Sequence, residues 1–182
     1  MSVMKHSLPT EIRITEETFQ DIEGIRQVNQ AAFKGDYEAD VIDRLRQNCS
    51  EILSLVARAR EQVVGHILFS PVHIDQNQGW KLKGMGLGPL AVHPEEQGRG
   101  IGSALCREGM QRMSQAGYPF VIVLGHPGYY PRFGFTTASA YGIYCSFENV
   151  PDEAFMICVL DQKGMQGVKG VAHYRSEFDE NS

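Results

Sequence analysis

The sequence predicts a mixed α/β fold in which helices flank one central sheet. The first observation is three segments rich in β-forming residues, 52–59, 62–74 and 80–92, joined by short turns as in an antiparallel meander. The second is a glycine-rich loop and a helix that separate the 80–92 strand from an apolar run at 120–124. Because such crossovers are right-handed and join parallel strands, we expect these two strands to pair in parallel.

The N-terminal part is expected to form a short strand and two helices before the meander. Residues Glu11–Thr15 alternate as an edge strand does. Thr18 and Asp21 suit the start of a helix whose apolar stripe ends near Phe33. A second, shorter helix is expected after Asp36.

The C-terminal third has weaker patterns. Residues 135–147 carry no clear periodicity, whereas 155–160 and 168–174 read as strands and a polar tail is expected from Ser176. The chain shows no repeats, linkers or low-complexity segments. We therefore expect one domain over residues 1–182, with its core at about 10–175.

The composition excludes several classes of protein. A net charge of −5 argues against a general nucleic-acid binder and suits a cationic amine substrate. No apolar run approaches the roughly 20 residues of a membrane span, and the first residues lack a signal-peptide core. We expect a cytoplasmic protein with no membrane partner and no structural metal. The four cysteines lack metal-ligand or CxxC spacing and are expected to be reduced core residues: Cys49, Cys106, Cys145 and Cys158.

The glycine loop between the 80–92 strand and the following helix predicts a phosphate site. Gly98, Gly100 and Gly102 alternate directly before the helix. They let the backbone turn tightly, so that several N–H groups can point toward one position. The dipole of the helix adds about half a positive charge at its N-terminus, which is the same position. The alternative is a turn that merely packs the helix on the strand.

Two other phosphate-binding motifs do not fit the spacing. A Walker loop needs the pattern GxxxxGK[ST], and no Lys follows the glycines here at that spacing. A dinucleotide fingerprint needs GxGxxG, but the third glycine, Gly102, falls one residue early.

The pattern that fits is Q-x-x-G-x-G, starting at Gln97 after a strand that ends in apolar-x-Val. Downstream, Tyr130 stands four residues before Gly134-Phe135. Together these landmarks resemble the GNAT superfamily of N-acetyltransferases. The FSP at Phe69–Pro71 and the runs LGPLAV and LGHPGYYPRFGF look most like its YhbS-like branch. The resemblance implies a GNAT-like fold, with a parallel strand pair that splays at the cofactor site.

The resemblance also implies that the loop amides cradle the pyrophosphate of acetyl-CoA. Pro89 inside a strand predicts a bulge, which either only twists the sheet or splays it so that the amides of Leu90 and Val92 bind the pantetheine arm. His126 stands where the family often carries an Asn and is a candidate polar contact. The expected cofactor-binding residues are Leu90, Ala91, Val92, Gln97, Gly98, Arg99, Gly100, Ile101, Gly102, Ser103, His126 and Tyr130.

Tyr130 is the expected general acid, by its position in the family motif. Acetyl transfer to an amine expels a thiolate, and a phenol of pKa about 10 can protonate a thiolate of pKa about 8.5 at a cost of about 2 kcal/mol. Tyr129 is expected to be a packing residue. The sequence does not identify the base that deprotonates the amine. The candidates are Asp36, Glu38, His66, His73 and His126.

The acceptor pocket is expected between the first two helices and a strand end, although an ordinary surface loop is the alternative there. Its expected residues are Phe33, Tyr37, Glu38 and Ser70. We expect direct transfer from acetyl-CoA to a primary amine of a small molecule or peptide, by a monomer or homodimer. The alternatives are a non-catalytic acyl-CoA-binding or sensor domain and a protein-interaction module with an empty groove.

Overall fold

The computed structural model describes residues 12–76 and 79–179. Glu11 and the middle of the turn after Asp75 lie outside this range. Within it, the strands form one sheet in the order β1-β2-β3-β4-β5-β8-β6, with β9 pairing with β3 and β7. The strands are β1 (Ile12–Glu16), β2 (Leu53–Ala59), β3 (Gln62–Asp75), β4 (Lys81–Val92), β5 (Phe120–Leu124), β6 (Thr136–Thr137), β7 (Ile143–Cys145), β8 (Phe155–Val159) and β9 (Gly170–His173).

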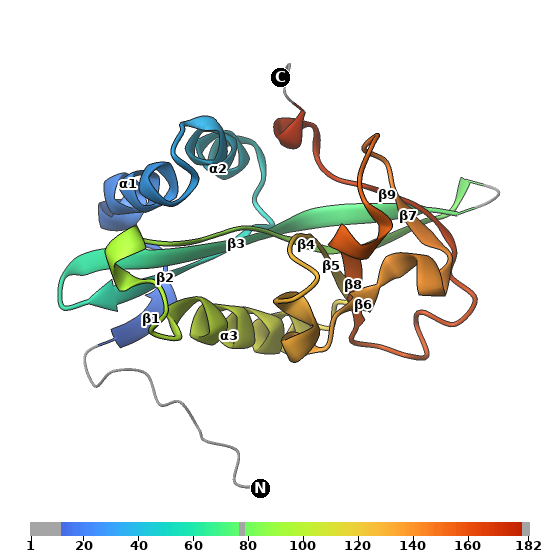
Figure 1. The fold of residues 1–182 in the computed structure, drawn as a ribbon. Coiled ribbons are helices and arrows are strands. Elements are labelled where there is room, and N and C mark those ends of the chain that lie inside the picture. Colours follow the sequence, from blue (N-terminus) through green and yellow to red (C-terminus); the bar gives the residue numbers. More distant parts are fainter. Residues whose placement is uncertain (1–11, 77–78, 180–182) are drawn as a thin grey trace, which may run out of the picture.

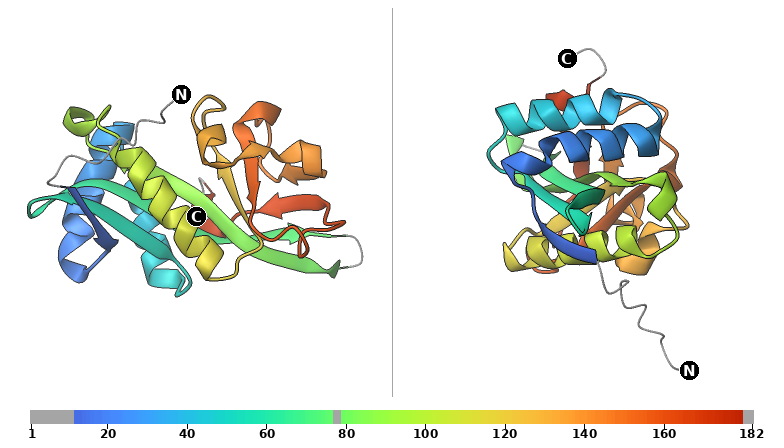
Figure 2. Two further views of the ribbon diagram at one scale, coloured as in Figure 1. Left: turned by 90° about the horizontal axis from the view of Figure 1, so that it is seen from below. Right: turned by 90° about the vertical axis from the view of Figure 1, so that its left-hand side faces the viewer.

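The sheet is covered by helices on both faces. Helices α1 (Ile22–Phe33) and α2 (Tyr37–Asn48) lie on one face, and α3 (Ile101–Gln115) lies on the other (Figures 1 and 2). The predicted mixed sheet is confirmed, because β2, β3 and β4 form the antiparallel meander and β4 pairs in parallel with β5.

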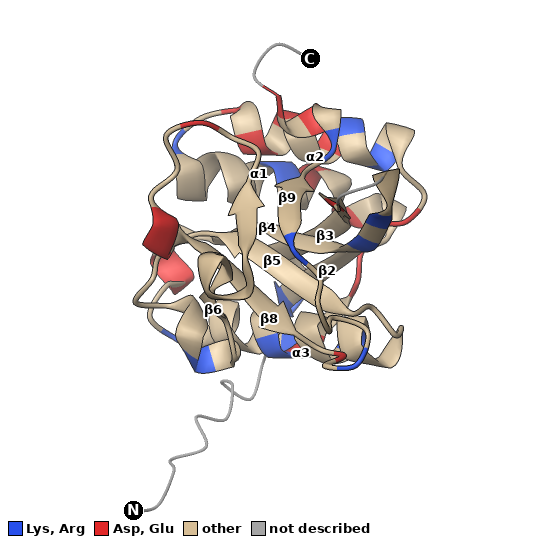
Figure 3. Cartoon of the chain, turned by 90° about the vertical axis from the view of Figure 1, so that its right-hand side faces the viewer, with Lys and Arg blue, Asp and Glu red and all other residues tan. Residues whose placement is uncertain are grey.

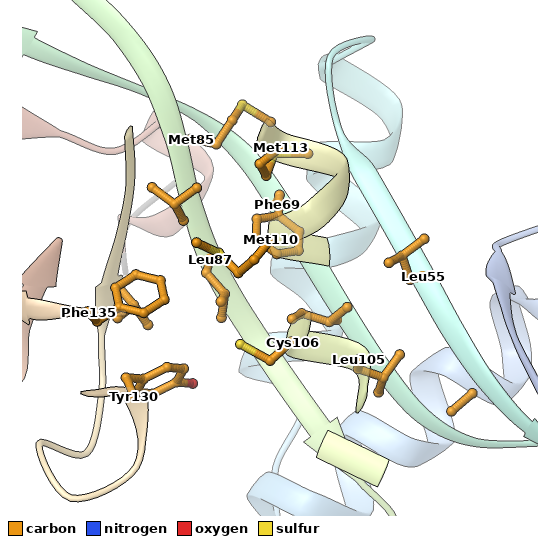
Figure 4. Packing of buried hydrophobic residues seen from close by; sticks show 14 of the residues in the cluster. Leu55, Phe69, Met85, Leu87, Leu105, Cys106, Met110, Met113, Tyr130 and Phe135 are labelled. Atoms are coloured by element: carbon orange, nitrogen blue, oxygen red, sulfur yellow. The ribbon is translucent and has the colours of Figure 1, made fainter. Parts of the chain in front are cut away.

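Strand alternation divides the core between the two faces. Leu55 joins the cluster under α3, whereas the next residue, Val56, packs with Ile25 and Leu45 of the two N-terminal helices. The cluster under α3 also contains Phe69, Leu87, Leu105 and Met110, which interlock between helix and sheet (Figure 4). Period-two alternation thus gives both faces of β2 an apolar surface, as a central layer requires.

The N-terminal helices begin and end close to where the sequence predicts. The backbone N–H and the hydroxyl of Thr18 donate to the Asp21 carboxylate at 2.7 and 2.8 Å, ahead of α1. Lys34 ends that helix in the left-handed region, with φ 57°. The helix α2 then starts directly after Asp36.

The predicted bulge lies at Gly88-Pro89. Opposite β3, Leu87 pairs with Phe69 and Leu90 pairs with Ile67, so β4 takes one residue more than its neighbour. The parallel pairing of β4 with β5 ends at the Leu87–Val123 pair. Beyond the bulge the two strands separate, and this opening is where both cavities described below meet.

The strand expected at 168–174 is confirmed as β9, whereas the segment after it differs from the sequence expectation. Strand β9 takes the edge of β3 beyond the end of β2, pairing His173 with His73. The segment Ser176–Phe178, expected to be part of a polar tail, forms a short turn against α2 (Figure 1). Tyr37 donates its hydroxyl to the Phe178 carbonyl at 2.5 Å, and Arg44 donates to the Glu177 carbonyl at 2.8 Å. These long-range contacts leave no signal in the local pattern.

Candidate active site

Two cavities meet where β4 and β5 separate. The first, about 760 Å³, runs from this opening to the glycine loop and the start of α3, and we call it the loop cavity. The second, about 420 Å³, extends to α1, α2 and the C-terminal turn, and we call it the aromatic cavity. Both cavities are lined by Leu90, His126 and Tyr130. Two molecules, one bound in each cavity, can therefore come into contact at these residues.

The glycine loop leaves a row of backbone donors at the loop cavity. Gly98 and Gly100 have φ values of 77° and 82°, which residues with a Cβ rarely adopt. The first α-helical hydrogen bond runs from the Ala104 N–H to the Gly100 carbonyl at 3.0 Å. The N–H groups of Ile101, Gly102 and Ser103 therefore have no partner within the helix and carry its positive end.

The edge of β4 offers further backbone donors. The His93 N–H donates to the Val64 carbonyl at 2.9 Å, toward β3. Because successive N–H groups of a strand point alternately to its two sides, those of Leu90 and Val92 point to the opening. Gln97 caps this edge by donating its side-chain amide to the Val92 carbonyl at 3.0 Å.

Two arginines that sequence reasoning missed add positive charge to the loop cavity. Arg107 and Arg132 both line it. The guanidinium of Arg132 lies 4.7 Å from the centre of the Tyr129 ring and donates to that residue's carbonyl at 2.9 Å. Arg107 lies over Phe133 at 5.6 Å. Arg107 could have been identified from the sequence, because it follows Ser103 by one helical turn and therefore lies on the same face of α3.

Two of the expected cofactor-binding residues do not line the loop cavity. The side chain of Arg99 forms an ion pair with Glu96 instead. Ala91 is 1% exposed and lies on the buried side of β4 between Leu90 and Val92. The positions of both side chains have a simple cause, since alternate residues of a strand face opposite ways and Arg99 has a neighbouring carboxylate.

Tyr129 packs against the cluster under α3, as expected, and in addition lines the loop cavity. Its hydroxyl is 3.5 Å from the Ser103 hydroxyl, at the N-terminus of α3. Burial raises the pKa of Tyr129, which keeps this phenol protonated. Apart from its position next to Tyr130, no spacing signal indicates this contact of Tyr129.

Tyr130 occupies the meeting point of the two cavities. Its ring is 9% exposed and packs edge-on against Phe135 at 5.7 Å, and Figure 4 shows its hydroxyl directed toward Cys106 and β4. Gly125 makes room for the ring, because a Cβ there would lie 2.4 Å from a ring carbon. The hydroxyl has no hydrogen-bond partner among the described residues, and burial raises its pKa. It is therefore a protonated donor facing the opening.

Cys106 lies beside Tyr130 but is not a nucleophile. Its side chain is completely buried in the cluster under α3. Burial raises the pKa of its thiol to about 12, so the reactive thiolate is absent near neutral pH.

His66 cannot be the base, because it is enclosed in a buried chain of hydrogen bonds. Asn29 donates to its Nδ1 at 3.2 Å, so Nε2 carries the proton and donates to Ser54 at 2.8 Å. Ser54 in turn donates to Glu17. Burial lowers the pKa of His66 to about 4, with the Glu17 charge partly opposing this. His66 is thus a neutral structural residue between α1 and the sheet.

Two further base candidates lie away from the opening. His73 borders a separate hollow with Asp75 and His173. Asp36 accepts a hydrogen bond from Gln30 at 2.6 Å and lines neither cavity. Of the five candidates, Glu38 and His126 remain, since both line the aromatic cavity.

The aromatic cavity contains three of the four expected acceptor residues. Phe33, Tyr37 and Glu38 line it, but Ser70 does not. Ser70 is fully buried in the middle of β3 and pairs with Gly86, before the bulge, where β4 and β5 are still joined. Three aromatic residues that the sequence did not indicate complete the walls: Phe147, Tyr174 and Phe178.

Comparison with known proteins agrees with this geometry. Residues 11–138 match a family model described as an acetyltransferase (GNAT) domain. The chain belongs to the GNAT family of acetyltransferases. It is 34% identical over 160 residues to the uncharacterized N-acetyltransferase YhbS of Escherichia coli K12, covering 87% of this chain and 93% of the relative. It is 38% identical over 157 residues to YjhQ of the same organism, covering 85% and 86%.

Two solved GNAT structures resemble the whole fold. The crystal structure of E. coli YhbS in complex with CoA superposes with a TM-score of 0.87 at 32% identity, covering 97% of this chain and 95% of that one. A GNAT acetyltransferase from Brucella melitensis in complex with acetyl-CoA gives 0.76 at 36% identity, covering 92% and 98%.

Proposed function

We propose that this GNAT protein is an N-acetyltransferase that moves an acetyl group directly from acetyl-CoA to a primary amine. The observation that carries the proposal is the meeting of two cavities at Leu90, His126 and Tyr130. Acetyl-CoA, the co-substrate, occupies the loop cavity and the amine occupies the aromatic cavity. Both substrates are then present together, and the reacting atoms lie between a backbone donor, a phenol and an imidazole.

The loop cavity suits the donor molecule chemically. The unpaired N–H groups of Ile101, Gly102 and Ser103, with the positive end of α3, would hold the pyrophosphate. Arg107 and Arg132 add two guanidinium groups, which bind phosphate well through paired N–H donors. The complexes of similar GNAT proteins with CoA and acetyl-CoA support this assignment.

The bulged strand and Tyr130 would carry the chemistry. The Leu90 N–H polarises the thioester carbonyl, and such a donor contributes roughly 3 kcal/mol where oxyanion charge develops. Tyr130 donates its hydroxyl hydrogen to the departing sulfur. Because burial raises the pKa of Tyr130, complete proton transfer costs more than the 2 kcal/mol estimated from free phenol, so a strong hydrogen bond in the transition state is its main contribution.

His126 would accept the proton of the amine. An amine with a pKa of about 10.4 costs about 4.6 kcal/mol to deprotonate at pH 7, so a base adjacent to the opening is valuable. His126 lines both cavities and is exposed, with no hydrogen bond from its ring to a described residue. Glu38 lines the aromatic cavity alone, which suits it better to bind the incoming cation.

Direct transfer agrees with the surroundings of the opening. The cysteine beside Tyr130, Cys106, is buried and protonated, so an acyl-cysteine intermediate has no nucleophile there. A sensor domain that only binds acyl-CoA has no need of a second cavity open to Tyr130. The aromatic cavity therefore favours an enzyme over that alternative.

Surface charge and the state of the cysteines support the proposed partners and cellular location. Basic and acidic residues are interspersed on the face that Figure 3 shows, without a continuous basic stripe for nucleic acid. None of the helices in the described part of the chain has the length and apolar character that a membrane span requires. All four cysteines are unpaired, as is usual in a reducing compartment, and we place the enzyme in the cytoplasm.

The proposal is tested by incubating the protein with acetyl-CoA and a panel of primary amines. We expect amine-dependent release of CoA thiol, together with a product heavier than the amine by one acetyl group in mass spectrometry. Intact-protein mass spectra during turnover should show no acetylated enzyme as an intermediate. Tight CoA binding by calorimetry without turnover of any amine would instead favour the sensor function.

A further inference from the structure

The aromatic cavity is lined by aromatic rings from separate parts of the chain, together with aliphatic residues and glycines. Phe33 and Tyr37 come from α1 and α2, whereas Phe147, Tyr174 and Phe178 come from the C-terminal third. Its volume of about 420 Å³ lies in the range of small-molecule sites, which run from about 300 to 1,000 Å³. A compact apolar group therefore fits its shape and surface.

Three of these rings are already ordered against one another. Tyr174 stacks on Phe147 with centroids 5.4 Å apart and planes 15° from parallel, and it meets Phe178 edge-on at 5.5 Å. The hydrogen bond from Tyr37 to the Phe178 carbonyl holds the backbone of the residue that carries the last ring against α2. A preorganised wall of this kind binds a flat, rigid group without first ordering its own side chains.

The cavity holds one negative charge. Of the residues that line it, Glu38 carries the sole carboxylate, and no Lys or Arg lines it. The other acidic residues of α2 are occupied, because Arg26 donates to Asp40 and Asp43 at 2.8 Å. Glu38 has no hydrogen bond or ion pair with any described residue, so it remains available for one cation.

The single carboxylate favours some classes of amine as ligands of the aromatic cavity over others. A single ammonium can lie between Glu38 and the faces of the surrounding rings, which attract cations. A polyamine would bring a second ammonium into the cavity, where no second carboxylate offsets the cost of removing it from water. A peptide would bury backbone N–H and C=O groups against walls that offer them few partners.

We propose that the acceptor is a monoamine in which a primary amine is joined by a short chain to an aromatic ring. The proposal rests on the N-acetyltransferase function given above. The ring lies against Phe147, Tyr174 and Phe178, and the ammonium is first held by Glu38. After losing a proton, the amine nitrogen bonds to the acetyl carbon while the carbon–sulfur bond breaks. The products are an N-acetylated arylalkylamine and CoA thiol.

The test compares 2-phenylethylamine with spermidine and with a short peptide that has a free N-terminus. We expect kcat/KM for 2-phenylethylamine to exceed that for each of the others at least tenfold. Glu38→Gln should raise KM for 2-phenylethylamine about tenfold and change KM for acetyl-CoA little. The matched control is Asp40→Asn, which removes a charge from the same helix outside the cavity and should leave both constants unchanged.

A binding measurement separates this inference from the proposed function. Calorimetry of 2-phenylethylamine on the CoA-saturated protein, where no turnover occurs, should show binding that Glu38→Gln weakens. Such binding without acetylation of any amine would overturn the N-acetyltransferase function but support the cavity's preference. A higher kcat/KM for spermidine or the peptide, a Glu38→Gln variant with unchanged KM, or no binding of 2-phenylethylamine would each overturn the inference.

Discussion

Tyr129 and Tyr130 are neighbours in the chain whose rings stand nearly perpendicular, with centroids 5.1 Å apart and an interplanar angle of 89°. The two hydroxyls consequently serve different places. That of Tyr129 lies near Ser103 at the start of α3, whereas Tyr130 lines both cavities. In the function proposed above, Tyr129 would therefore contact the donor molecule and Tyr130 the reacting atoms.

The first prediction concerns the general acid. Tyr130→Phe keeps the buried ring and removes the hydroxyl, so kcat should fall at least tenfold, within the usual range for acid–base groups. The dissociation constant for CoA, measured by calorimetry, should change little. Tyr129→Phe is the matched control and should reduce kcat less. Equal turnover by wild type and Tyr130→Phe would remove Tyr130 from the mechanism.

The second prediction concerns the base. His126→Gln keeps a polar side chain but cannot accept the amine proton, so kcat at pH 7 should fall at least tenfold. The loss should shrink as the pH rises toward the pKa of the amine, because more of the amine is then already neutral. A pH profile of kcat for both proteins checks this. A constant ratio across that pH range would show that His126 has a structural role.

The third prediction concerns the missed arginines. Arg107→Gln should weaken CoA binding about tenfold, a loss of about 1.4 kcal/mol, and the loss should diminish at high salt. Arg99→Gln removes the same charge from a residue that does not itself line the loop cavity and is paired with Glu96, so it should leave binding nearly unchanged. The reverse order of the two effects would contradict the observed geometry and favour the expectation from sequence.

The fourth prediction concerns the room that Gly125 leaves for Tyr130. Gly125→Ala places a Cβ 2.4 Å from the ring, so the ring must shift and kcat should fall. Gly128→Ala adds the same methyl group in the same loop, where nothing lies within 4 Å, and should be close to neutral. Both are measured as kcat and as melting temperature. Identical kinetics for the two variants would argue against a fixed position of the ring.

The fifth prediction concerns the pH dependence of stability. His66 is buried and neutral, with a pKa of about 4 against about 6.5 in the unfolded chain. Its lowered pKa stabilises the fold above pH 6.5, and this contribution is lost as the pH falls toward 4. Between pH 7 and pH 5 the free energy of unfolding should drop by about 2 kcal/mol from this residue. Urea denaturation at the two pH values measures the change.

The control for this prediction is His66→Gln, which cannot titrate. Its free energy of unfolding should change far less between pH 7 and pH 5 than that of the wild type. The acidic groups with lowered pKa, such as Glu17, contribute mainly below this interval, because their ordinary pKa is about 4.5. An equal pH dependence in both proteins would show that His66 is not the titrating group.

The parts of the fold that sequence reasoning predicted are those with local signals. The glycine loop and the limits of β5 follow from glycines and from one apolar run, 120–124. The bulge follows from one residue, Pro89, that cannot complete a ladder. Each of these features is determined by neighbouring residues and therefore appears in the sequence as a short pattern.

The missed parts depend on long-range pairing. Tyr174 and Phe178 reach the aromatic cavity because β9 pairs with β3, about a hundred residues earlier. Ser70 was wrongly expected there because the position along β3 at which the sheet opens is set by β4 and β5, not by β3 itself. No local pattern carries this information.

The two cavities differ in whether the C-terminal residues contribute to them. Every residue that lines the loop cavity falls within the 11–138 segment matched by the family model, whereas Phe147, Tyr174 and Phe178 lie after it. If the aromatic cavity binds the acceptor, as proposed above, substitutions in the last forty or so positions would change which acceptor is used and leave the loop cavity intact. Swapping that terminal portion between related enzymes would then be a direct route to altered amine selectivity.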